Sequence, residues 1–161
     1  MMSDKTKILF VCLGNICRSP AAEEIMRQQA NRAGLGAEVV VDSAGTYGGH
    51  AGSLPDERMR EAAAVRGYNQ TSRSRQLKRT DFDDFDMVVV MDDANYERVH
   101  RMAPTREDAQ KIFRMTEFCR QYEATHIPDP YYEGRRGFEH VLDLLEDACG
   151  GLLDEIRAGK V

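Results

Sequence analysis

Residues 7–20 have the sequence KILFVCLGNICRSP, in which a short apolar segment runs directly into a turn-forming loop. The first seven of these residues are nearly all apolar, which is typical of a strand buried on both faces of a parallel sheet. Gly14 and Asn15 follow, and these residue types tolerate a left-handed backbone best. We expect Ser19 to cap a helix whose first turn contains Pro20. The stretch therefore predicts a strand, a tight loop and a helix in immediate succession.

Apolar segments alternate with amphipathic ones along the rest of the chain. Further strands are expected over residues 37–42, 86–91 and 111–115, and helices over 19–33, 56–66, 92–102 and 137–158. In the last helix, Gly150 and Gly151 predict either a kink or close packing against a neighbour. The alternation predicts an α/β fold, an open parallel sheet covered by helices on both faces. We expect a single domain over residues 1–161.

Composition excludes several classes of function. The chain has 161 residues and a formal net charge of −5, which argues against nucleic-acid binding. The longest apolar run has six residues, far fewer than the roughly 20 that span a bilayer, so we expect no membrane association. Residues 1–7 lack the apolar core of a signal peptide. The four cysteines form no C-x-x-C pair, and the four histidines lack metal-ligand spacing, so a cytoplasmic protein without metal or cofactor is expected.

The loop after the first strand has the composition of an oxyanion site. A bare C-x5-R pattern is weak, but here the cysteine ends a buried strand and the arginine begins a helix. Backbone N–H groups of such a loop can form an anion nest, which the positive end of the helix strengthens. Arg18 can bind two oxygens of a tetrahedral oxyanion, and these surroundings favour the Cys12 thiolate, to which Ser19 could donate a hydrogen bond. The predicted phosphate-binding loop comprises Leu13, Gly14, Asn15, Ile16, Cys17 and Ser19.

The segment FVCLGNICRSP, residues 10–20, closely resembles the signature loop of the low-molecular-weight protein tyrosine phosphatases. The resemblance extends along nearly the whole chain and includes Asp42 to Thr46, Pro55-Asp56, Ser74 to Gln76, Asp81-Phe82, Met91-Asp92 with Asn95, and Asp129 to Tyr132. It implies a four-stranded parallel sheet with flavodoxin-like layering. It also implies hydrolysis of phosphotyrosine in proteins, and of small aryl phosphates, through a phosphocysteine on Cys12 and without metal. We expect a monomer that can self-associate weakly.

Residues 127–134, IPDPYYEG, form a proline-stiffened loop that presents a carboxylate. From the sequence alone an aspartate between two prolines is more often a turn residue. The resemblance implies instead that Asp129 is the general acid, which protonates the departing phenol and later activates water. Tyr131 and Tyr132 match the family's paired tyrosines at the mouth of the pocket, which can themselves be phosphorylated.

Two supporting residues fall at the carboxyl ends of predicted strands, where open parallel sheets bind ligands. The resemblance implies that Ser43 hydrogen-bonds Asn15 and maintains the shape of the loop, and that Asp92 is a second supporting acid. Ser72 stands where many members carry a histidine paired with that acid. We therefore expect Asp92 to bond elsewhere, to Asn15 or to an arginine.

The substrate mouth departs from the family pattern at Gly49, where members usually carry a bulky aromatic residue that forms one wall of the slot. Tyr47 or His50 could form that wall instead, and the sequence does not decide between them. Preference among phosphopeptides is left open by this change.

The position of Cys17 indicates a redox-sensitive site. It lies five residues from Cys12, in a loop whose curl could bring the two sulfurs close together. A thiolate at Cys12 would be the sulfur most open to peroxide, and Cys17 could capture the sulfenic acid as a disulfide. The resemblance supports this, since members with both cysteines are reversibly inactivated.

Two other functions compete with phosphotyrosine hydrolysis. A thioredoxin-coupled arsenate reductase resembles this fold but needs two further cysteines to relay a disulfide. Residues 76–92 contain no cysteine, and Cys119 and Cys149 are 30 residues apart. A non-catalytic phosphotyrosine-binding module is the other alternative, and the joint presence of Cys12, Arg18 and Asp129 argues against it.

Overall fold

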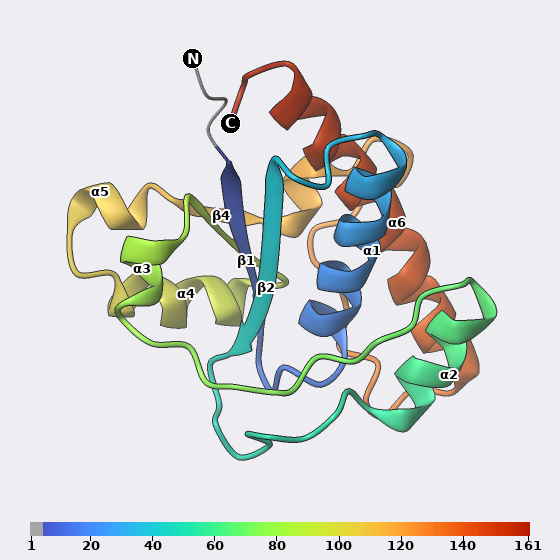
Figure 1. The fold of residues 1–161 in the computed structure, drawn as a ribbon. Helices are drawn as coiled ribbons and strands as arrows, with labels where there is room; N and C mark the ends of the chain where they lie inside the picture. Colours follow the sequence, from blue (N-terminus) through green and yellow to red (C-terminus); the bar gives the residue numbers. More distant parts are fainter. Residues whose placement is uncertain (1–4) are drawn as a thin grey trace.

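The computed structural model describes residues 5–161. Residues 1–4, which begin the predicted domain and belong to the segment in which we expect no signal peptide, lie outside the described residues. Four parallel strands form one sheet in the order β2-β1-β3-β4 (Figure 1). These strands are β1 (Thr6–Cys12), β2 (Val39–Gly45), β3 (Met87–Val90) and β4 (Ile112–Arg114). The predicted four-stranded parallel sheet is confirmed.

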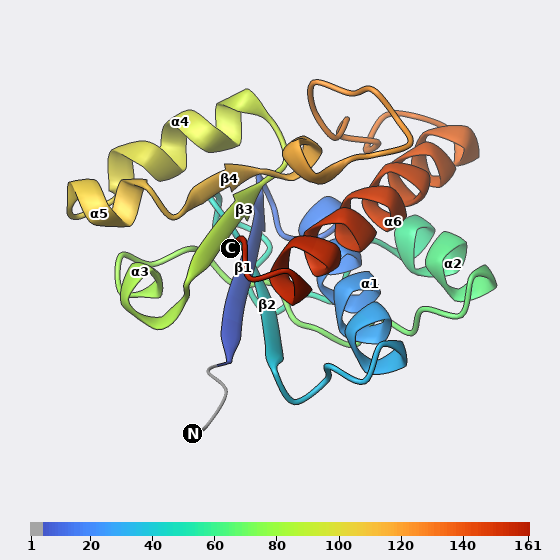
Figure 2. The same ribbon diagram turned by 90° about the horizontal axis from the view of Figure 1, so that it is seen from above.

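Helices cover both faces of this sheet, as predicted. Figure 2 shows α1, α2 and α6 on one side and α3, α4 and α5 on the other. The helices are α1 (Arg18–Arg32), α2 (Glu57–Val65), α3 (Asp81–Asp84), α4 (Asp93–Met102), α5 (Arg106–Ala109), the 3₁₀ turn η1 (Met115–Phe118) and α6 (Arg135–Arg157). Sequence analysis did not predict α3, α5 and η1, because four residues are too few to display a helical period.

The central strand β1 decides which side chains face which layer. Ile8, Phe10 and Cys12 belong to the core beneath α1 and α6, whereas Leu9 and Val11 belong to the core beneath α4. Successive side chains of a strand point to opposite faces, so this division follows from the alternation along β1. It also directs the Cys12 side chain toward the face on which α1 begins.

Close packing rather than a kink accounts for one glycine of the pair in α6, since α6 is one continuous helix from Arg135 to Arg157. A Cβ atom at Gly151 would lie 1.9 Å from the carbonyl oxygen of Phe118, and Arg120 Nη2 donates to Gly151 O at 3.3 Å. A Cβ atom at Gly150 would meet nothing closer than Gln29 Oε1, at 3.7 Å. Only Gly151 is therefore required by the contact between α6 and the η1 region.

No helix within residues 5–161 combines the length and the apolar composition that crossing a bilayer requires.

We predict opposite effects of alanine at the two glycines. Gly151→Ala forces a methyl group into the Phe118 carbonyl and should lower the free energy of unfolding by about 1–3 kcal/mol. Gly150→Ala is the matched control and should raise it by about 0.5–1 kcal/mol, since alanine favours a helix over glycine. Urea unfolding of the two variants measures both values, and equal effects would contradict the packing role of Gly151.

Candidate active site

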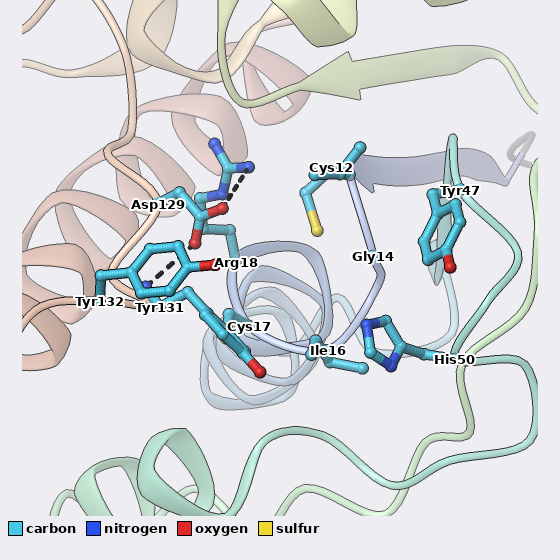
Figure 3. Close-up of a pocket in the computed structure, with 11 residues that line it drawn as sticks. Cys12, Gly14, Ile16, Cys17, Arg18, Tyr47, His50, Asp129, Tyr131 and Tyr132 are labelled. Atoms are coloured by element: carbon cyan, nitrogen blue, oxygen red, sulfur yellow. Dashed lines mark hydrogen bonds and ion pairs between the residues drawn. The ribbon is translucent and has the colours of Figure 1, made fainter.

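A pocket of about 300 Å³ opens at the carboxyl end of β1, where parallel sheets bind ligands (Figure 3). Its lining combines the loop after β1 with two other loops, and consists of Cys12, Leu13, Gly14, Ile16, Cys17, Arg18, Tyr47, His50, Asp129, Tyr131 and Tyr132. The three residues expected to act chemically therefore share one cavity. Asn15, Ser19, Ser43 and Asp92 are not part of this lining.

The loop between β1 and α1 contains a left-handed residue, Asn15, with φ of 57°. Its side chain is held at both ends, because Nδ2 donates to Ser19 Oγ at 2.8 Å and Oδ1 accepts from the N–H of Arg75 at 3.0 Å. Ser74 Oγ also donates to the carbonyl of Gly14 at 3.0 Å. The segment before α3 thus fixes the curved backbone that turns N–H groups inward.

Ser43 does not bond Asn15, so that expectation is wrong. The Ser43 hydroxyl donates instead to Glu23 Oε1 at 2.6 Å. Glu23 is buried on α1, and its Oε2 accepts from Arg27 Nη2 at 2.6 Å. A buried carboxylate needs donors more than an amide that is already satisfied, which explains the change of partner. Ser43 therefore supports α1 rather than the loop itself.

Ser19 does not cap the helix as predicted, because α1 already begins at Arg18. Its hydroxyl lies 3.0 Å from Cys12 Sγ, and both atoms are buried. Since Oγ accepts from Asn15, its single proton is left for the Cys12 sulfur or for the Ala44 carbonyl, at 3.4 Å. A hydroxyl proton at that distance can stabilise a thiolate.

Arg18 is a buried cation with fixed partners. Nη1 donates to Asp92 Oδ2 at 2.8 Å and to the carbonyl of Ile127 at 3.0 Å. Burial works to lower the pKa of Arg18, but the Cys12 sulfur and the carboxylates of Asp92 and Asp129 raise it above its ordinary value. With Nη1 occupied, Nε and Nη2 are left to bind an oxyanion side by side.

Asp92 bonds an arginine, one of the two partners that we expected for it. Its Oδ2 atom contacts Arg18, and its Oδ1 accepts from the N–H of Asn95 at 2.8 Å, which caps α4. Asp92 thus joins the buried cation to the start of a helix.

Asp129 faces the pocket from the opposite loop, with its side chain 46% exposed. Oδ2 lies 3.8 Å from Arg18 Nη2, and Oδ1 accepts from the N–H of Tyr131 at 3.1 Å. Figure 3 shows Tyr131 and Tyr132 beside it, with their rings edge to face at 5.0 Å. The carboxylate is therefore both oriented and open to solvent, as proton transfer requires.

Tyr47 and His50 form the wall across the pocket from Asp129 (Figure 3), and their rings meet edge to face at 5.9 Å. Gly49 does not line the pocket, so its assignment to the mouth is wrong. A Cβ atom at Gly49 would lie 2.1 Å from the Tyr47 hydroxyl oxygen. The missing side chain therefore leaves the space that Tyr47 occupies.

Cys17 lies in the same loop as Cys12 and is buried. Burial, followed by the charge of Asp56, raises the pKa of the Cys17 thiol, so that it is protonated at neutral pH. Its capture of an oxidised Cys12 stays a prediction. Neither Cys119 nor Cys149 lines the pocket.

Among the contributors to the site that sequence reasoning missed are Glu23 and the carbonyl of Ile127. Neither had a signal that could have found it. Glu23 was one of several charges on a helix, and a main-chain carbonyl carries no sequence information.

Comparisons with known proteins agree with this geometry. Residues 7–161 match the family model described as low molecular weight phosphotyrosine protein phosphatase. A relative from Synechocystis is 49% identical over 150 residues, covering 93% of this chain and 96% of that protein. The low molecular weight protein-tyrosine-phosphatase of Streptomyces coelicolor is 41% identical over 94% of this chain and 93% of its own length. A crystal structure of protein tyrosine phosphatase from Entamoeba histolytica has a TM-score of 0.95, 44% identity, and coverage of 98% and 100%.

The pocket wall generates a prediction about binding of aryl phosphates. Tyr47→Ala should raise KM about 3- to 10-fold with little change in kcat, because stacking is similar in ground and transition states. Gly49→Trp should also raise KM, since the new side chain displaces Tyr47. Tyr122→Ala, at an exposed tyrosine that does not line this pocket, is the control. A lower KM for Gly49→Trp would show that the wall was open.

Proposed function

The chain belongs to the low molecular weight phosphotyrosine protein phosphatase family and is a cysteine-dependent protein tyrosine phosphatase, and we propose that Cys12, Arg18 and Asp129 carry out its chemistry. Cys12 is the nucleophile, Arg18 binds the phosphate, and Asp129 is the general acid and base. The observation that carries this proposal is the meeting of all three side chains in one pocket at the end of β1. The substrates of the family are phosphoproteins.

In the first step the Cys12 thiolate attacks phosphorus in line with the phenolic oxygen. The S–P bond forms as the P–O bond to tyrosine breaks, and Asp129 gives its proton to the departing oxygen. Loop N–H groups and the Nε and Nη2 donors of Arg18 balance the charge on the three equatorial oxygens. A phosphocysteine and a free tyrosine result.

In the second step water replaces the sulfur. Asp129, now ionised, accepts a proton from the attacking water, and the S–P bond breaks to release phosphate. Ser19, 3.0 Å from Cys12 Sγ, donates to the sulfur as it becomes a thiolate again. The same carboxylate thus acts as acid and then as base.

The exposed tyrosines at the mouth of the pocket favour a phosphotyrosine substrate over a smaller phosphate ester. Tyr47 is 54% exposed and Tyr131 40% exposed, on opposite sides of the cavity. A phenyl ring that carries the phosphate down to Cys12 would contact both walls. We also propose that the enzyme is a single-domain monomer. We propose a cytoplasmic location as well, since its four cysteines are free, as is usual in a reducing compartment.

We predict that Cys12→Ser abolishes hydrolysis of 4-nitrophenyl phosphate but leaves binding of inorganic phosphate within about 3-fold of wild type. The loop N–H groups and Arg18 remain, whereas a serine hydroxyl is not ionised at neutral pH. Calorimetric titration with phosphate measures the binding. The matched control is Cys149→Ser, a buried cysteine away from the pocket. Loss of phosphate binding together with activity would make Cys12 structural.

For Asp129→Asn we predict a loss of kcat/KM that depends on the leaving group. Phenyl phosphate, with a poor leaving group, should lose about 10²–10⁴-fold, and 4-nitrophenyl phosphate far less. A series of substituted aryl phosphates gives the slope of log kcat/KM against phenol pKa. Asp83→Asn, at an exposed aspartate of α3 outside the pocket, is the control. Equal losses for all phenols would remove Asp129 from the role of acid.

A further inference from the structure

The segment that carries Asp129 has few attachments to the rest of the molecule. Its start is fixed at Ile127, whose N–H donates to the main chain after β3 at 2.8 Å. Beyond Asp129, Arg58 reaches it from α2, and its Nη1 donates to the carbonyl of Tyr131 at 2.8 Å. Among the residues that the structure describes, no other hydrogen bond joins residues 129–133 to an earlier part of the chain. Arg58 therefore provides the polar contact that positions the segment after Asp129, alongside the packing of the buried Pro130.

Arg58 is itself held from the side of the cysteine loop. Its Nε lies 3.1 Å from Asp56 Oδ1, and its Nη2 lies 3.0 Å from Asp56 Oδ2. Asp56 caps α2, and its own N–H donates to the carbonyl of Ile16 at 2.7 Å. One guanidinium group thus connects the loop of Cys12 with the segment of Asp129.

Both neighbouring aromatic rings fix the plane of this guanidinium. Its central carbon lies 5.1 Å from the ring centre of Tyr131 and 4.9 Å from that of Phe138. Phe138 is buried in the first turn of α6, so it provides a rigid surface. A planar fork that pairs with a carboxylate and also stacks on rings is a property of arginine that lysine lacks.

We propose that Arg58 is a positioning residue for the general acid. Tyr131 joins the two groups, because its carbonyl accepts from Arg58 and its N–H donates to Asp129 Oδ1. Arg58 touches neither Cys12 nor the phosphate site, and acts by holding the Asp129 carboxylate over the pocket. The proposal rests on the role of Asp129 as acid, and displacement of a catalytic group by about 1 Å can cost 10²-fold in rate.

Two variants of Arg58 test this. Arg58→Ala removes every contact, and Arg58→Lys keeps the charge but cannot span Asp56 and Tyr131 together. For both we expect kcat/KM to fall roughly 10- to 100-fold with phenyl phosphate and less than about 3-fold with 4-nitrophenyl phosphate. If the alanine variant fails to fold, the leaving-group dependence of kcat/KM in the lysine variant is sufficient to test the proposal. A wild-type leaving-group slope in Arg58→Lys would overturn the proposal.

Arg60→Ala is the matched control. Arg60 also lies on α2 and donates to a main-chain carbonyl, that of Pro55, at 2.9 Å, but it does not touch the segment of Asp129. The kcat/KM of Arg60→Ala should equal that of wild type with every aryl phosphate.

Inhibition by inorganic phosphate should be unchanged in the Arg58 variants. If phosphate binding weakens as much as kcat/KM falls, Arg58 acts through the cysteine loop and the proposal is wrong.

The double variant Arg58→Ala/Asp129→Asn separates the two proposals. If Arg58 acts through Asp129, the double variant should be no slower than Asp129→Asn, whereas an additional 10-fold loss would overturn the positioning role. If Asp129→Asn itself shows no dependence on the leaving group, the acid assignment fails. If log kcat/KM depends steeply on phenol pKa in Asp129→Asn, but Arg58→Ala loses the same factor with every phenol, the acid role of Asp129 stands and only the positioning role of Arg58 is refuted.

Discussion

The left-handed backbone of Asn15 is the constraint on which the rest of the site depends. A non-glycine residue in that region costs about 1–2 kcal/mol, and the cost is offset by the bonds from its side chain to Ser19 and to the N–H of Arg75. With φ at 57°, the chain turns from β1 into α1 within a few residues. The turn brings the Cys12 sulfur, the loop N–H groups and the positive helix end around one point. An extended residue 15 would separate them.

Charge balance is the second requirement of the pocket. A buried guanidinium without a partner would be costly, and Asp92 at 2.8 Å supplies the compensating charge. The loop N–H groups, the start of α1 and the free Arg18 donors must together offset the thiolate and the phosphate dianion, which would otherwise repel each other. Asp129 stands farther from Arg18, at 3.8 Å, and is more exposed, so it can exchange protons with water. The same cation thus serves two carboxylates with different tasks.

The fold separates the parts of the site that perform chemistry from those that meet the substrate. Cys12 and Arg18 lie on a core strand and a core helix, where packing fixes their positions. Tyr47, His50 and the paired tyrosines lie on loops, where side chains can change without disturbing the sheet. Tyr47 illustrates this, because it forms part of the pocket wall and occupies the space beside Gly49 from a loop separate from that of Cys12.

Local sequence patterns determined the strand, loop and helix of residues 7–32, the parallel sheet, and the position of Cys12 and Arg18 at its carboxyl end. These features depend on neighbours within a few residues, on alternation and on helical period, all of which a sequence displays. The family resemblance added Asp129. Only the tertiary structure decided that Ser43 bonds Glu23, that Tyr47 fills the space over Gly49, and that Arg58 reaches Tyr131. Each of these pairs competes with other partners of the same chemistry. Which one wins depends on distances set by the packing of whole elements, and no local pattern encodes those distances.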